Sequence, residues 1–187
     1  DSDIIIADLT IDPSATLDLN GKSLTVSGVF SVNGTLKLQG NEAAVSTPTL
    51  NNGSTAEYSR TAGDQTLQSW DYSNATLKIN GSGGEFSLAG VTTCKNVDVS
   101  AGTLDLDGFD LTVTGTFIVT DTLKLRGGET ISTPTFGANA VAEYSATAGS
   151  RDIKNWTYPT LRINGAGGTF TLPASLSATN VELAAGT

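Results

Sequence analysis

Apolar and polar residues alternate with a period of two along most of this chain. Such alternation is typical of short β-strands that turn one side to a core and the other to water. It appears in Leu17-Asp18-Leu19, Leu24-Thr25-Val26, Leu36-Lys37-Leu38, Leu77-Lys78-Ile79 and Leu111-Thr112-Val113. No helical periodicity of useful length competes with it. The pattern therefore predicts an all-β chain built from many short strands.

Pairs of turn-forming residues separate these blocks. They are Asn20-Gly21, Ser27-Gly28, Asn33-Gly34, Asn80-Gly81, Asp107-Gly108 and Asn164-Gly165. Glycine readily adopts the positive φ angles that tight turns require, and Asn and Asp tolerate them. We therefore expect a tight turn at each of these pairs.

The chain also contains two copies of one long unit. Ala56-Glu57-Tyr58-Ser59 returns as Ala142-Glu143-Tyr144-Ser145, which is 142 − 56 = 86 positions later. Downstream, Ile79-Asn80-Gly81 returns as Ile163-Asn164-Gly165, a shift of 163 − 79 = 84. We place the first copy at about residues 9–95, the second at about 96–179 and the start of a third at 180–187. Self-similarity of this kind indicates a repetitive fold.

Two architectures suit such a chain: a continuous β-solenoid and a pair of tandem β-sandwich domains. Sandwich domains usually have a seam between them, but no Pro-rich or charged linker interrupts residues 97–117. Strand blocks recur so closely that three or four coils of roughly 20 to 28 residues would account for one copy. We therefore favour one continuous solenoid over residues 1–187, with tandem sandwiches as the alternative.

A solenoid leaves unpaired strands at its two ends. The sequence shows no polar helical cap at either end and starts with the apolar run Ile4-Ile5-Ile6. Repeat proteins usually protect such ends with capping repeats. We therefore expect the chain to continue into further repeats, or to form a homo-oligomer or filament.

Charge and cysteine content narrow the range of partners. The net charge is −9, and the ten Lys and Arg residues are scattered, so we expect no nucleic-acid partner. No stretch approaches the roughly 20 apolar residues that cross a bilayer, so we expect no membrane insertion. Cys94 is the one cysteine, which excludes an internal disulfide, and its counterpart Ala178 indicates a small core side chain.

Two blocks carry a resemblance to known proteins. Gly102-Thr103-Leu104-Asp105-Leu106-Asp107-Gly108 and Asn33-Gly34-Thr35-Leu36-Lys37-Leu38 resemble those of bacterial surface β-strand-repeat proteins. These include the right-handed parallel β-helices of filamentous haemagglutinin-like and autotransporter-type adhesins. The segment from Ala56 to Leu88 is similar to the recurring unit of very large secreted bacterial surface proteins. The resemblance implies an extracellular or cell-surface stalk, adhesin or filament component, and it transfers no catalytic residue.

Asp105, Asp107 and Asp110 form the best candidate metal site. Clustered carboxylates suit calcium, and Gly108 would let the loop fold around an ion. Against this, Asp105 stands at a solvent-facing strand position between two leucines, and no Glu closes the loop as in an EF-hand. A turn followed by a solvated strand is therefore the alternative interpretation, and calcium is the one cofactor that the sequence suggests.

Trp70 and Tyr72 recur as Trp156 and Tyr158 at equivalent places in the two copies. Aromatic side chains on a rigid β-surface can stack on sugar rings, so these pairs are candidates for glycan binding. Alternation places Trp70 and Tyr72 on one side of a strand, where both would lie in the core or both at the surface. Core packing and surface recognition are the two interpretations.

An enzyme is a further alternative, because some parallel β-helix enzymes cleave acidic polysaccharides with convergent carboxylates and cations. Lys37 and Lys124 recur singly at strand positions, which is typical of a soluble outer face, and Asp64 becomes Ser150 in the second copy. We therefore predict a structural extracellular or cell-surface scaffold without catalytic activity. A glycan-binding adhesin is the second hypothesis.

Overall fold

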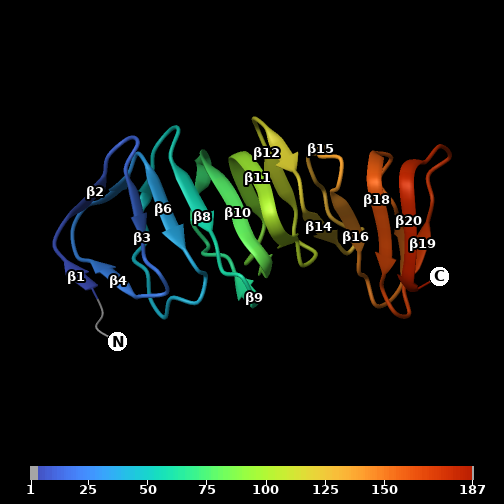
Figure 1. Cartoon of the computed structure of the whole chain (residues 1–187), viewed down its shortest axis with the longest axis horizontal. Helices are drawn as coiled ribbons and strands as arrows, with labels where there is room; N and C mark the ends of the chain where they lie inside the picture. The colour runs from blue at the N-terminus through green and yellow to red at the C-terminus, as the bar shows by residue number, and fades with distance from the viewer. Residues whose placement is uncertain (1–3, 187) are drawn as a thin grey trace.

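The chain forms a parallel β-solenoid of about 9 turns, as its computed structural model shows. The structure describes residues 4–186; residues 1–3 and Thr187, the last position of the predicted third copy, lie outside this range. In Figure 1 the turns follow one another along the long axis, and the two ends of the chain lie at opposite ends of the molecule. All strand pairings within residues 4–186 are parallel. The all-β solenoid is therefore confirmed, and the alternative of tandem antiparallel sandwiches is wrong.

One turn of the coil consists of three short strands. β2 (Leu9–Ile11), β3 (Thr16–Asp18) and β4 (Leu24–Val26) follow one another, and β5 (Phe30–Val32) then stacks on β2. Because Leu9 pairs with Phe30, one turn takes about 20 residues, at the short end of the expected range. We call the three sides of the coil the first face (β2), the second face (β3) and the third face (β4).

The other short strands continue these three faces. In the first half of the chain they are β1 (Ile4–Ile6), β6 (Thr35–Leu38), β7 (Thr49–Leu50), β8 (Thr55–Tyr58) and β9 (Gly63–Thr66). In the second half they are β12 (Leu111–Val113), β13 (Phe117–Val119), β14 (Thr122–Leu125), β15 (Thr135–Phe136), β16 (Val141–Tyr144), β17 (Ser150–Asp152), β18 (Thr157–Asn164), β19 (Thr169–Thr171) and β20 (Ser177–Ala185).

Two long strands at the centre bend around the corners of the coil and join the faces. They are β10 (Tyr72–Ser87) and β11 (Thr92–Asp105). β11 pairs in turn with β12, β13 and β14, which lie on three successive faces, so this one strand makes a full turn. The sheet that contains β10 and β11 therefore runs from β3 to β20 without a break.

The two sequence copies occupy different faces of the solenoid. β8 of the first copy lies on the second face, where it stacks between β6 and the Thr76–Ile79 part of β10. Its counterpart β16 stacks on β14, which follows the Thr103–Asp105 part of β11 and the Glu85–Ser87 part of β10 on the third face. One copy of about 86 residues therefore makes four turns and one further face, rather than a whole number of turns.

The core is a ladder of apolar side chains that runs through the inside of the coil. Leu36, Ala56, Leu77 and Val97 stand in register on successive turns, and all four are buried. The cluster continues through both copies without a polar interruption at their junction. The apolar positions of the period-two pattern are therefore the inward positions of the solenoid.

The predicted turn pairs behave in two ways. Asn20-Gly21 and Asp107-Gly108 both adopt positive φ, as expected for tight turns, whereas Gly28, Gly34 and Gly165 do not. Asn80-Gly81 forms no turn, because it lies inside β10, and Gly81 has no positive φ. The prediction of a tight turn there is wrong. The reason for a glycine is close packing: a Cβ on Gly81 would lie 2.0 Å from the Arg60 carbonyl oxygen of the preceding turn.

Candidate functional site

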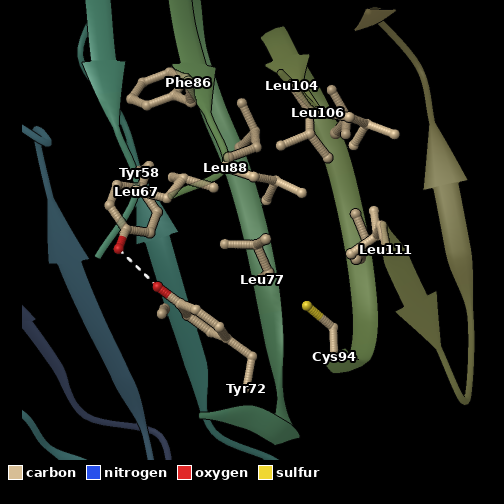
Figure 2. Packing of buried hydrophobic residues seen from close by; sticks show 14 of the residues in the cluster. Tyr58, Leu67, Tyr72, Leu77, Phe86, Leu88, Cys94, Leu104, Leu106 and Leu111 are labelled. Carbon is tan, nitrogen blue, oxygen red and sulfur yellow. Dashed lines mark hydrogen bonds between the residues drawn. The ribbon is translucent and has the colours of Figure 1, made fainter. Parts of the chain in front are cut away.

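The tyrosines of the first copy form a buried hydrogen-bonded pair. The hydroxyl oxygens of Tyr58 and Tyr72 lie 2.9 Å apart and point toward each other from β8 and β10 (Figure 2). The Tyr72 hydroxyl donates to the Gln68 carbonyl at 2.8 Å, and the Tyr58 hydroxyl accepts from the Gln68 amide at 3.0 Å. Since Tyr72 uses its proton on Gln68, Tyr58 donates to Tyr72. The pair fixes the backbone at Gln68 inside the coil.

The second copy repeats this arrangement. The hydroxyl oxygens of Tyr144 and Tyr158 lie 3.1 Å apart, and they bond the backbone amide and carbonyl of Lys154. Burial raises the pKa of Tyr144 to about 12, and it also raises the pKa values of the other three tyrosines above the ordinary value of 10.0. All four hydroxyls are thus internal structural groups.

The tryptophans of the two copies differ in their exposure. Trp70 is only 8% exposed, and it lies beside Tyr72 in a small pocket that the segment 88–92 of the next turn also lines. Trp156 is half-buried and turns instead toward Phe136 of the preceding turn, with ring centroids 5.9 Å apart. The first copy therefore hides its tryptophan, while the second leaves one partly open.

An aromatic groove surrounds Trp156. Phe136, Trp156 and Tyr158 form a triangle of rings with centroid separations of 5.9 to 6.0 Å. The groove encloses about 780 Å³ and is lined by Thr133, Pro134, Thr135, Phe136, Ala138, Asn155, Trp156, Thr157, Tyr158, Pro159 and Thr179. Its size is in the range of small-ligand sites, and its lining combines apolar rings with a few polar groups.

The wall of the solenoid is interrupted at this groove. β15 pairs with β13 but not with β18, so no ladder joins residues 133–138 to residues 155–159. The first copy has the same interruption, since β7 pairs with β5 but not with β10, and at its edge the amide of Gly53 donates to the carbonyl of Asn74 at 3.3 Å. The second copy is two residues shorter at this point and has Pro159 there. It also has Phe136 where the first copy has Leu50.

The three candidate calcium ligands each have a separate partner. Asp105 is 5% exposed and forms an ion pair with Lys124 at 3.0 Å. Asp107 pairs with Arg126, and a carboxylate oxygen of Asp110 accepts from the Thr130 amide at 2.6 Å. The structure thus directs these carboxylates to the following turn rather than to one another. Within residues 4–186, no group of three or more His, Cys, Asp and Glu side chains is placed to hold a metal ion.

Charges on the outside of the coil form a ladder of alternating sign. Members on successive turns stand in register, and ion pairs with N–O distances of 2.7 to 3.7 Å join five of the seven neighbouring couples. On the second face the ladder is Asp18, Lys37, Glu57 and Lys78, and on the third face it is Asp105, Lys124, Glu143, Arg162 and Glu182. Lys37 and Lys124, which we considered under the enzyme alternative, thus belong to this ladder.

Comparisons of the chain with known protein families, with curated proteins and with solved structures returned no match. Among the described residues, no helix has the length and apolar character needed to cross a membrane. The candidate site is therefore defined by geometry alone.

Sequence reasoning identified Trp156 and Tyr158 but missed Phe136. Phe136 follows a threonine in a two-residue strand, where alternation places it in the core. The available signal was a difference between the copies: a leucine at position 50, a phenylalanine at 136, and a two-residue deletion beside Pro159.

Proposed function

We propose that this chain is a rigid spacer, a section of an extracellular or cell-surface stalk or fibre. The observation that carries the proposal is the unbroken parallel sheet from β3 to β20, with each turn in register with the next. Each turn hydrogen-bonds to its neighbours and buries its apolar side against them. About 9 turns at strand spacing give a rod about 40 Å long. The location outside the cell follows the resemblance to bacterial surface proteins.

The charge ladder supports this function by specifying the order of the turns. Exposed ion pairs contribute little to stability, about 0–1 kcal/mol each. Their signs alternate from turn to turn, however, so a strand that skipped one turn would place like charges side by side, as at Lys37 and Lys78. The ladder therefore favours regular stacking over slipped pairing.

The same stacking offers a route to assembly. At the C-terminal end of the described chain, Val181 and Leu183 in β20 are exposed, and they border an apolar hollow with Ile163 and Phe170. A further turn laid on this end, from the same chain or from a second copy, would bury these side chains. We propose that the rods extend in this way into longer fibres.

Distance measurements between two dyes test the spacer. Cysteines introduced at the exposed positions Asp12 and Ser175 carry the dyes, while burial raises the pKa of the native Cys94 thiol to about 12 and keeps it unreactive. We expect one narrow distribution of energy transfer. Insertion of a second copy of residues 96–179 after residue 95, with Ser175 left unchanged in the inserted copy, should then lengthen the separation by about 20 Å, the height of about four turns. A broad distribution, or a separation that the extra copy leaves unchanged, would contradict the proposal.

Adhesion through glycans is a second candidate function, favoured by the open groove at Trp156. Stacking of sugar rings on partly exposed aromatic side chains is a common basis of carbohydrate recognition. A glycan array probed with the intact protein tests this candidate, and the absence of any specific signal would leave the spacer as the function.

A further inference from the structure

We propose that the groove of Phe136, Trp156 and Tyr158 binds a neutral, uncharged oligosaccharide, and that the first copy has lost this ability. The inference rests on the adhesive candidate function and assigns it to one place. It also predicts that the two copies of the sequence provide a single binding site, which lies in the second copy.

The floor of the groove suits the apolar face of a pyranose ring. The half-buried rings of Phe136 and Trp156 are 5.9 Å apart and inclined by 55°, so they form a shallow wedge rather than a flat stack. The buried Tyr158 supports both rings from below, and its hydroxyl is held by Tyr144 and Lys154. The floor is therefore fixed in place before a ligand arrives, which lowers the entropic cost of binding.

The rim determines the class of sugar. Thr133, Thr135, Thr157 and Thr179 are exposed around the rings and provide hydroxyls, and the exposed Asn155 provides an amide. These groups both donate and accept hydrogen bonds, as sugar hydroxyls do. None of the lining residues is charged at neutral pH, although the chain as a whole carries −9. An acidic sugar would find no cation in the groove, and the negative chain would repel it.

The first copy has the same sequence pattern but a closed site. Leu50 replaces the phenylalanine, Trp70 is turned into the core, and the bond from Gly53 to Asn74 lies at the edge of the gap in the wall. The first copy therefore provides a matched control within the same molecule. A proline-rich peptide is the other ligand that aromatic grooves accept, but such a peptide presents mainly carbonyl acceptors, and the rim supplies acceptors as well as donors.

The test uses the full chain against immobilised neutral, acidic and amino oligosaccharides and one proline-rich peptide. Affinity for the best neutral oligosaccharide is then measured by titration of the intact protein and its variants. We expect Trp156→Ala to weaken binding about tenfold or more, and Phe136→Leu, which copies Leu50, to weaken it several-fold. Trp70→Ala should leave the affinity unchanged within about twofold. Circular dichroism confirms that each variant remains folded, and Phe136→Leu serves if Trp156→Ala does not fold.

The outcomes separate this inference from the proposed functions. Binding of a neutral oligosaccharide that depends on Trp156 and Phe136 supports it. Glycan binding that depends on Trp70, or that prefers acidic sugars, overturns it but retains adhesion. Binding of the peptide alone, or of nothing, overturns both this inference and adhesion. The dye-distance result for the rigid spacer is independent of all of these outcomes.

Discussion

At the scale of single residues, the two copies keep the same backbone turn in the core even where their side chains differ. Ser54 is fully buried, and its hydroxyl oxygen has no hydrogen-bond partner. The equivalent position in the second copy is Ala140, and the backbone turn is the same: the amide of each residue donates to the carbonyl three positions before it, Asn51 or Gly137. An unpaired buried hydroxyl costs free energy that an alanine methyl does not.

We therefore predict that Ser54→Ala stabilises the protein, by about 1 kcal/mol in the free energy of unfolding measured with urea. The reverse change, Ala140→Ser, should destabilise it by a similar amount. A lower stability of Ser54→Ala would contradict this prediction.

Two buried glutamates illustrate a residue-scale feature that the alternation pattern does not reveal. The carboxylate of Glu129, which is 1% exposed, accepts the amide protons of Arg126 and Gly127, and Glu42 does the same for Gln39 and Gly40. Each glutamate thus satisfies the backbone of a corner after a strand. The sequence shows only that a Gly and a Glu recur at this corner in both copies. Their role in satisfying the backbone amides becomes clear only when the loop closes in three dimensions.

At the scale of elements, the corner inside β10 depends on the absence of a side chain. A Cβ on Gly81 would lie 2.0 Å from the Arg60 carbonyl oxygen, and the same distance separates a Cβ on Gly165 from the Ala146 oxygen. The neighbouring atom is backbone, which can yield only if two turns move apart. Close contact between turns is therefore the requirement for glycine here.

Gly81→Ala should lower the free energy of unfolding by about 1–3 kcal/mol, because it overpacks a corner between two stacked turns. Gly90→Ala is the matched control, since a Cβ there meets no atom within 4 Å, and we expect a change below about 0.5 kcal/mol. Chemical unfolding followed by circular dichroism measures both. Equal effects of the two changes would refute the steric argument.

The sequence predicts elements well wherever one side of a strand is buried. Leu36-Lys37-Leu38 has its leucines inside and its lysine outside, as alternation requires. Asn80-Gly81 is misleading, because its glycine is needed for close packing between turns, while the same Asn-Gly sequence is typical of tight turns. Alternation places Phe136 on the inward side of its strand, but it does not reveal whether the next turn pairs with that strand. Phe136 was missed for this reason. These failures share a cause: contacts between turns are about 20 residues apart and leave no local pattern.

For the whole molecule, the four buried tyrosines link stability to alkaline pH. The folded chain keeps protons on these hydroxyls above pH 10.0, where the unfolded chain releases them, and the pKa of Tyr144 is raised to about 12. The unfolded state then binds fewer protons, so the free energy of unfolding falls as the pH rises. The stabilising contribution is complete below pH 10.0 and is lost through about pH 12 and above.

We expect tyrosinate absorbance to appear together with the loss of the β-sheet circular dichroism signal, not before it. The Cys94 thiol, with a pKa raised to about 12, acts in the same direction, and Cys94→Ala removes its share. Its counterpart Ala178 shows that the position accepts the smaller side chain. Titration of all four tyrosines near pH 10 with the sheet intact would contradict this expectation.

Because one copy ends a third of a revolution beyond its starting face, the sequence repeat acts as a screw operation. β2, the Val97–Val99 part of β11 and the Val181–Leu183 part of β20 are equivalent in sequence, yet they lie on the first, second and third faces in turn. In any array with this period, matching features would wind around the axis and realign after three copies, a pitch of about 60 Å at strand spacing. A flat neighbour pressed against one side would therefore meet each feature only once per pitch, whereas partners that surround the rod would meet every one.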